Sequence, residues 1–411
     1  TLTRSSAASD VYKRQPHRLT GGGTSVRAMR VDVHFYCGVP MPDAGADGPD
    51  PVDRRYGNDA VIECYRNLEH WAQTAEGYGF DTMWLTEHHF QHEGYEVVPN
   101  LILMGMHLAS LTERLRFGQA FNVVPQWHPL RLAEDYATAD ILTGGRMVFG
   151  VGRGTVPREM ETLGGVVASG DNDMSASRDA VNREVFEEAM DVIRLAWSQE
   201  RFSYTGKHFV FPPPGIPDRG GTVTDLTLVP RPVHSTEIFH PATSPPTIDF
   251  VARVGHTAIF AGGPLERTEQ GWRRFDEVAA EHGRDLAPGE GRALHLNCHV
   301  GRSSRQAIDG VRAGHDEYVK FLRPYGRFSH YRPDAPFDHG PTVEETADVG
   351  HMLIGSIEQV ADRIGTIRDR LSLRHLLLFL DFPGLDRAAI DDQMALLAEE
   401  VLPRVDIELS R

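Results

Sequence analysis

Positive charge, and lysine above all, is scarce in this sequence of 411 residues. Its 42 lysines and arginines face 58 aspartates and glutamates, which leaves a net charge of −16, and lysine occurs only at Lys13, Lys207 and Lys320. A nucleic-acid binder needs a basic surface to meet the phosphate backbone. The composition therefore argues against a nucleic-acid partner and leaves arginine as the side chain for binding one small phosphate.

Cysteine and long apolar runs are also scarce. Cys37, Cys64 and Cys298 are widely separated and form no CxxC pair, so neither a disulfide framework nor a zinc site is predicted. No apolar run of about 20 residues is present to span a bilayer. The run HHFQHE from His88 to Glu93 has neither the HExxH nor the HxxEH pattern, so we expect no metal. A cytoplasmic protein without a membrane partner fits best.

Residues 1–28 are treated apart from the rest of the chain. The first of them, residues 1–15, have no methionine start and no apolar signal core, and they resemble translated adapter sequence. A strand-like Met-Arg-Val-Asp-Val-His-Phe begins at Met29. We expect residues 1–28 to be a non-native or disordered extension, the alternative being a genuine flexible one, and residues 29–411 to form a single domain.

From Met29 onward, apolar runs alternate with amphipathic stretches, which is typical of an α/β fold with parallel strands. The predicted strands cover residues 31–37, 83–85, 115–124, 147–151, 237–240, 258–261, 293–300 and 375–380. The predicted helices cover about 58–78, 100–111, 129–142, 178–199, 267–282, 304–322, 357–371 and 387–402, with a short helix ending at Val254.

Three segments interrupt this alternation. Residues 155–176 read as a loop, and about 200–235 reads as an insertion that begins with a β-hairpin over 202–211. The segment of about 323–341 is rich in Pro, Gly and aromatic residues, and long loops in compact domains are usually functional, so we expect a lid there. The aromatic residues that either shield a site or pack on the rim are Phe321, Tyr325, Phe328, Tyr331 and Phe337.

Titratable residues follow the second predicted strand directly, as Glu87, His88 and His89. Loops after the carboxyl ends of parallel strands carry the chemistry of α/β sheets and barrels. An imidazole there can exchange a proton near neutral pH or hydrogen-bond an oxygen. His88 is therefore a candidate catalytic residue, with a structural histidine as the alternative. Glu87 and His89 either orient their neighbours or form a hydrogen-bonded structural pair.

Several motifs together resemble the bacterial luciferase-like flavin monooxygenases. They are Glu-His-His-Phe at 87–90, Gly-Gln-Ala-Phe-Asn-Val-Val-Pro at 118–125, His-Pro-Leu-Arg at 128–131 and Phe-Gly-Val-Gly-Arg-Gly at 149–154. The resemblance is closest over residues 79–164 and extends more weakly over most of the chain from Met29. It implies a (β/α)8 TIM barrel with insertions, a fold whose active sites lie at the carboxyl ends of the strands.

The resemblance also assigns phosphate-binding residues. Arg153 and Arg178 match arginines that reach the flavin phosphate, and a guanidinium suits that dianion. Ser244 and Thr247 match a helix N-terminus that holds the same phosphate, although the Pro-Pro pair between them removes two N–H donors. Surface salt bridges are the alternative for the arginines, and ordinary helix capping is the alternative for the hydroxyl residues.

The third predicted strand ends where the family packs backbone beneath the flavin ring. Ala120 and Asn122 occupy that place, and the resemblance suggests a cis peptide bond between Ala120 and Phe121. Gly152 stands where the luciferases proper have a reactive cysteine, so light emission is not expected.

The function that the resemblance implies is a two-component monooxygenase. A separate flavin reductase would supply reduced FMN, which would react with O2 to a flavin hydroperoxide and transfer one oxygen to a small organic substrate. The alternatives are a deazaflavin-dependent oxidoreductase that transfers hydride and a non-catalytic flavin-binding protein. A homodimer is a family expectation, and the substrate stays open.

Overall fold

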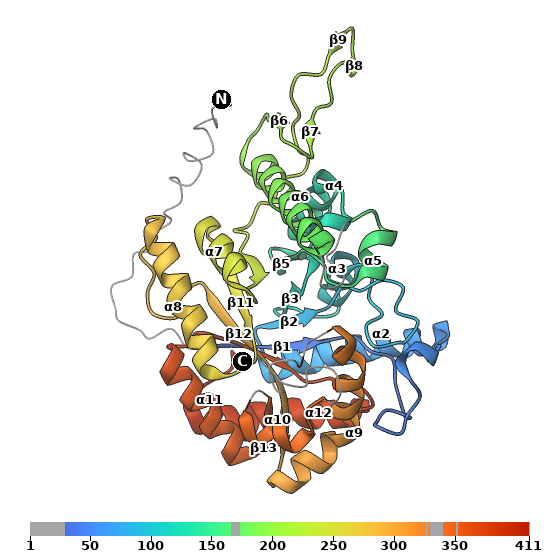
Figure 1. Ribbon diagram of the computed structural model, residues 1–411, viewed down its shortest axis with the longest axis vertical. Coiled ribbons are helices and arrows are strands. Elements are labelled where there is room, and N and C mark those ends of the chain that lie inside the picture. Colours follow the sequence, from blue (N-terminus) through green and yellow to red (C-terminus); the bar gives the residue numbers. More distant parts are fainter. Residues whose placement is uncertain (1–28, 166–172, 326–327, 329–339, 351, 411) are drawn as a thin grey trace.

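A closed barrel of parallel strands forms the centre of the protein (Figure 1). Around the barrel the order is β10, β11, β12, β14, β1, β2, β3 and β5, and β5 pairs with β10 to close it. The strands are β1 (Arg30–Phe35), β2 (Thr82–Leu85), β3 (Arg116–Gln119), β5 (Met147–Gly152), β10 (Ile238–Pro241), β11 (Thr257–Ala261), β12 (Arg292–Gly301) and β14 (His375–Phe379). The predicted TIM barrel is confirmed.

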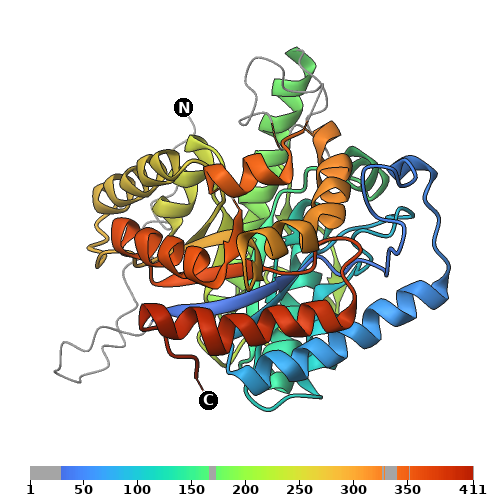
Figure 2. The ribbon, with the colours of Figure 1, turned by 90° about the horizontal axis from the view of Figure 1, so that it is seen from below.

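The computed structural model describes residues 29–165, 173–325, 328, 340–350 and 352–410. Helices cover the outside of the barrel, and α2 and α12 lie side by side on one flank (Figure 2). The longer helices of the described part are α2 (Asn58–Tyr78), α3 (Leu101–Ala109), α4 (Pro129–Thr143), α6 (Asp173–Ser198), α7 (Pro245–Val254), α8 (Leu265–Glu281), α9 (Ser304–Leu322), α11 (Ile357–Leu371) and α12 (Arg387–Leu396).

Each helix turns an apolar face to the strands, as its spacing predicts. In α2 the inner face includes Leu68, Trp71 and Ala75, and the Trp71 ring stacks on Phe35 of β1 with 5.1 Å between ring centroids. Gly79 then ends α2 in the left-handed conformation, with φ of 89°, where a residue with a Cβ would be strained.

Side chains fill the amino-terminal half of the barrel. Trp84 and Phe239 pack together there, and Asp32 is fully buried beside them. Trp84 Nε1 and His375 Nε2 each lie 2.6 Å from Oδ2 of Asp32. Burial raises the pKa of Asp32, but Arg30 and His375 lower the pKa by a larger amount, so that it reaches about 2. These described side chains pack around a charged carboxylate in this half, and the cavity of the barrel lies toward the carboxyl ends of the strands.

The prediction of one continuous strand over residues 115–124 is wrong, because the structure has two strands there. The chain forms β3 (Arg116–Gln119) and then β4 (Asn122–Val123), and the Ala120–Phe121 peptide bond between them is cis, as the resemblance suggested. The amide Nδ2 of Asn122 donates to Oε1 of Gln119 at 2.6 Å and to the carbonyl of Gly150 at 2.9 Å. Asn122 therefore fixes the bend between the two strands.

Other predictions need correction. Residues 155–176 are not all loop, because α5 (Pro157–Thr162) lies within them and α6 begins at Asp173. The helix α10 (Val343–Val349) and the strand β13 (Leu353–Ser356), which pairs with β12 beyond the barrel, were not predicted either, although Thr342 and Glu345 form a capping box at the start of α10. Each of these elements is short, so its periodicity is too weak to read.

The insertion at about 200–235 contains the predicted hairpin and a second one. β6 (Tyr204–Thr205) pairs antiparallel with β7 (Val210–Phe211), and β8 (Pro217–Asp218) with β9 (Gly221–Thr222). Both hairpins project from the body beyond α6 (Figure 1). The expected extension at 1–28 and most of the expected lid lie outside the described residues. In the part that is described, no helix has the length and apolar character to cross a bilayer.

Candidate active site

A cavity of about 530 Å³ opens at the carboxyl ends of the barrel strands. Its wall contains residues that follow β2, β3, β5, β10 and β11, together with residues of α8 and α9. Cofactor and substrate sites are usually of this size and occupy this face of an α/β barrel. The predicted residues His88, Ala120, Arg153 and Thr247 line the cavity, whereas Asn122, Arg178 and Ser244 do not.

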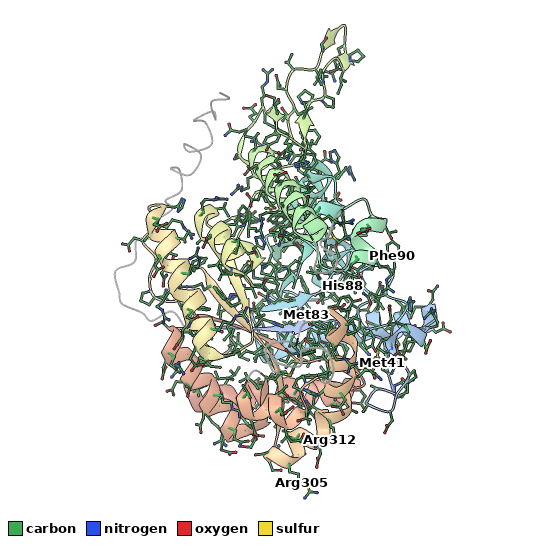
Figure 3. The ribbon with its side chains drawn as sticks, in the orientation of Figure 1. Met41, Met83, His88, Phe90, Arg305 and Arg312 are labelled. Atoms are coloured by element: carbon green, nitrogen blue, oxygen red, sulfur yellow. The ribbon has the colours of Figure 1, made fainter. Side chains whose placement is uncertain are left out.

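His88 has a carboxylate at each of its two ring nitrogens. Nδ1 lies 3.0 Å from Oε1 of Glu159, and Nε2 lies 3.1 Å from Oε2 of Glu96. A carboxylate can only accept hydrogen bonds, so both nitrogens must carry a proton for both contacts to form. Figure 3 shows His88 toward the centre of the molecule, with the half-exposed Phe90 nearer its surface. The geometry defines an imidazolium ion held between two carboxylates.

The electrostatics agree with this geometry. Burial lowers the pKa of His88, but Glu96 and Glu159 raise it by more, and the pKa reaches about 9. Burial raises the pKa of Glu159, but the opposite effect of His88 is larger, so the pKa of Glu159 is lower than its ordinary value. At neutral pH His88 is therefore a cation that can donate a hydrogen bond or a proton, and it is not a free base.

Neither carboxylate was predicted from the sequence. Glu96 lies in the loop after β2 and Glu159 in the first turns of α5, a helix that was predicted as loop. Its start did carry a signal, because Pro157 followed by an acidic residue in the first turn is typical of a helix N-terminus. Gln91 Nε2 donates to Oε1 of Glu159 at 2.8 Å and so ties the β2 loop to α5.

A second contact between these segments is an ion pair. Arg158 on α5 forms a bidentate ion pair with Glu93, with Nη1–Oε1 at 2.8 Å and Nη2–Oε2 at 2.9 Å. A bidentate arginine–carboxylate pair is planar and holds its two partners in a defined orientation. The β2 loop and α5 are therefore positioned as one unit around His88.

Glu87 and His89 form the expected pair, with Nε2 of His89 at 3.3 Å from Oε1 of Glu87. The same oxygen accepts from Nε1 of Trp127 at 3.3 Å and from the backbone N–H of Val123 at 3.4 Å. Glu87 lines the cavity and His89 does not. Glu87 therefore ties the end of β2 to β4 and to the segment that follows β4.

Arg153 follows β5 directly and faces the cavity. Its Nη1 lies 2.8 Å from Oδ1 of Asp179 and 3.3 Å from Oδ1 of Asn182, both on α6. The guanidinium thus has an anionic partner that a bound phosphate would replace or share. Arg178 instead pairs with Glu161 at the surface, away from the cavity wall. The structure brings only Arg153 of the two predicted arginines into the cavity.

The N-terminus of α7 faces the cavity through Thr243 and Thr247. The N-cap residue Ser244 makes no side-chain bond to the backbone, and its Oγ lies 3.0 Å from Oγ1 of Thr247. Pro245 and Pro246 have no N–H to donate, and the N–H of Thr247 already bonds the carbonyl of Ser244 at 3.0 Å. An anion here would be held by hydroxyl groups rather than by the helix backbone.

Aromatic residues form the outer part of the wall. Phe321, Tyr325 and Phe328 line the cavity, whereas Tyr331 and Phe337 lie outside the described residues. Tyr95 stacks on Phe321 with 4.0 Å between ring centroids and supports it from behind. Among the described residues, no group of three or more His, Cys, Asp or Glu side chains has an arrangement that could hold a metal ion.

The chain matches the family model of the luciferase-like monooxygenases over residues 45–374. It is 26% identical over 360 residues to 4-hydroxyprotoasukamycin monooxygenase of Streptomyces nodosus subsp. asukaensis, a match that covers 85% of this chain and 88% of that protein. Limonene 1,2-monooxygenase of Rhodococcus erythropolis is 25% identical over 363 residues, which cover 86% of this chain and 85% of the relative.

A solved structure has the same architecture. The oxygenating constituent of 3,6-diketocamphane monooxygenase from Pseudomonas putida, in complex with FMN, superposes with a TM-score of 0.70 at 19% identity, covering 92% of this chain and 99% of that chain. The family model matches well over half of the chain. The protein therefore belongs to the luciferase-like monooxygenase family, a family of oxidoreductases.

Proposed function

We propose that this protein is a flavin-dependent monooxygenase that uses reduced FMN and dioxygen to oxygenate a small organic substrate. The observation that carries the proposal is the His88 imidazolium in the wall of a cavity that also contains Arg153 and Thr247. Membership of the family supports it, as do two relatives named as monooxygenases and a structural neighbour that holds FMN. A separate flavin reductase would supply the reduced cofactor.

The residues of the cavity suit this cofactor. Ala120 and Gly152 contribute mostly backbone to the wall, and a planar ring can lie against such a surface. A Cβ added at Gly152 would come within 3.1 Å of the Cβ of Phe121, so a larger residue would disturb this part of the wall. Arg153 and the hydroxyl of Thr247 are the groups that would hold the phosphate. Arg178 would reach it only after leaving Glu161.

The bound flavin would supply the oxygen chemistry, by forming a hydroperoxide with dioxygen that delivers one oxygen atom to the substrate. The protein's part falls to His88 and its partners. The imidazolium stabilises negative charge that develops on a nearby oxygen, and it can donate a proton to that oxygen. Glu96 and Glu159 keep the ring protonated and fix its orientation. Phe321 and Tyr325 exclude water from the site.

A rapid-mixing experiment tests this proposal. The full chain is loaded with photoreduced FMN under anaerobic conditions and mixed with oxygenated buffer, while the near-ultraviolet absorbance of a flavin hydroperoxide is followed. We expect the hydroperoxide to accumulate in the wild type. It should decay faster in His88→Gln, because a neutral amide donates a weaker hydrogen bond to the peroxide oxygen than the imidazolium does. The control is His282→Gln, an exposed histidine after α8 that should leave the decay unchanged.

Two other results would overturn the proposal. Failure to bind reduced FMN, with tight binding of a reduced deazaflavin, would indicate hydride transfer instead. Tight binding of reduced FMN whose reaction with oxygen matches that of free flavin would indicate a flavin-binding protein without catalysis.

A further inference from the structure

The wall of the cavity has a polar region on the side opposite Ala120. In the barrel, β12 is separated from β3 by β14, β1 and β2 in one direction and by β11, β10 and β5 in the other, so the two strands face each other. His295 and Asn297 of β12 both line the cavity. They alternate with Leu294 and Leu296, which pack outward against the main core. This polar region therefore lies across the cavity from the expected bed of the flavin ring.

A hydrogen-bonded chain of two histidines leads to this region. Nε2 of His34 lies 2.8 Å from Oγ1 of Thr86, and Nδ1 of His34 lies 2.8 Å from Nε2 of His295. One imidazole donates and the other accepts, so two neutral rings satisfy the contact. Within the described part of the chain, Nδ1 of His295 is left without a hydrogen-bond partner. The tautomer of the pair decides whether that nitrogen donates or accepts.

Asn297 adds a second unused group two residues further along the strand. Its amide Nδ2 is buried and has no hydrogen-bond partner among the described residues. A buried donor without a partner carries a free-energy cost. Such a cost is relieved when a bound molecule supplies an acceptor, and in parallel strands the side chains of residues two apart point to the same face. Asn297 and His295 are therefore placed to bind one and the same group.

The region carries no formal charge. Burial lowers the pKa of His295 to about 4. The pKa of His34 lies well below its usual value, mainly because the ring is buried and also because His295 is next to it. Both rings are therefore neutral at pH 7. The charged residues of the cavity wall lie on other elements and are Glu87, His88, Glu96, Arg153, Glu159 and Arg267. None of them is on β12 itself; Arg267 belongs to α8, which follows the neighbouring strand β11.

We propose that His295 and Asn297 determine substrate specificity by hydrogen-bonding the neutral carbonyl or hydroxyl oxygen of the substrate. The proposal rests on the proposed function, because it assumes that the flavin occupies the opposite side of the cavity. Leu377 and Met352 offer apolar surface beside this region for the carbon skeleton of the substrate. The preferred substrate is then an uncharged, oxygen-bearing organic molecule and not an organic anion.

Matched probes test the proposal directly. Acetophenone, ethylbenzene and benzoate have similar size, but they carry a carbonyl, a methylene and a carboxylate at the same place. Their dissociation constants are measured by ligand-detected NMR on the full chain with FMN present. One good hydrogen bond predicts that acetophenone binds about 5–10-fold more tightly than ethylbenzene. In Asn297→Leu and in His295→Phe this ratio should fall toward one, while ethylbenzene binding and FMN binding persist.

Two further variants make the test specific. His295→Gln keeps a hydrogen-bonding amide and should retain part of the preference for acetophenone. His282→Phe makes the same kind of change at an exposed position and should leave the ratio unchanged. The proposal is wrong if the wild type shows no preference for acetophenone, if it prefers benzoate, or if both His295→Phe and Asn297→Leu keep the wild-type ratio. Failure of the proposed function is seen separately, as the absence of reduced-FMN binding in the wild type.

Discussion

Nδ1 of His88 lies 3.0 Å from Oε1 of Glu159, and this contact joins the end of β2 to α5. The two residues are 71 positions apart in the chain. Together with Glu96 at the other ring nitrogen, Glu159 determines that the candidate catalytic histidine is charged at neutral pH. Predictions about charge and pH dependence follow from these contacts.

Replacing Glu159 by glutamine should lower the pKa of His88, because an amide keeps a hydrogen bond but removes the negative charge. The wild-type hydroperoxide should lose lifetime as the pH rises through about 9, since His88 then loses its proton. In Glu159→Gln the midpoint should lie at lower pH. The measurement is the decay rate against pH. Glu161→Gln, an exposed change on the same helix, is the control, and an unmoved midpoint in Glu159→Gln would contradict the assignment.

The same contacts should make stability depend on pH. The pKa of His88 is raised from 6.5 to about 9, so its charged contacts stabilise the fold fully below pH 6.5 and are lost as the pH rises through about 9. The difference in free energy of unfolding between wild type and Glu96→Gln should therefore shrink from neutral pH toward pH 10. Urea unfolding at several pH values measures it, and a difference that stays constant would count against this coupling.

FMN affinity should depend on the pair between Arg153 and Asp179. Nη1 of Arg153 lies 2.8 Å from Oδ1 of Asp179, so a phosphate has to compete with a carboxylate. We expect Asp179→Asn to tighten FMN binding by about 3–10-fold and Arg153→Met to weaken it by about 10–100-fold. Quenching of FMN fluorescence measures both. The control is Asp191→Asn, which is on the same helix and paired with Arg194, and it should leave FMN affinity unchanged. If both Asp variants changed the affinity equally, the effect would come from net charge and not from the Arg153–Asp179 pair.

The hydroxyl of Thr247 should contribute a large part of the affinity for phosphate, because few backbone N–H groups are available at this helix N-terminus. The two prolines before it donate no N–H, and its own N–H is already used within the turn. Thr247→Val should therefore weaken FMN binding by roughly 5–10-fold with little change in thermal stability. Thr366→Val, on the exposed face of α11, is the matched control. Unchanged affinity in Thr247→Val would place the phosphate elsewhere.

Asp32 should be a main determinant of acid stability. Its pKa is lowered to about 2, so the stability that its charge contributes is present above pH 3.8 and is lost as the pH falls toward 2. Asp32→Asn should destabilise the protein by about 3 kcal/mol at pH 7, because the partly buried Arg30 and the buried His375 lose their anion. Chemical unfolding at pH 7 and pH 3 measures this, and the variant should be the less acid-sensitive protein. An equal loss at both pH values would contradict it.

The local pattern of the sequence determined much of the fold. Each of the eight barrel strands was predicted, and so was the helix that begins at the capping residue Ser356. These features depend on the period of apolar residues and on caps, which are properties of neighbouring residues. The short elements α5, α10 and β13 were missed for the same reason, since a few residues do not establish a period.

Only the tertiary structure decided the chemistry of the site. The motif indicated His88, but its charge depends on Glu96 and Glu159, which approach it through folding of the β2 loop and α5. Likewise, the resemblance assigned both Arg153 and Arg178 to the flavin phosphate, and only the structure shows that Arg153 faces the cavity while Arg178 pairs with Glu161 outside it. The sequence by itself determines which residues are available, and the distances between distant segments decide their charge and exposure, because electrostatic interactions and burial depend on separation in space.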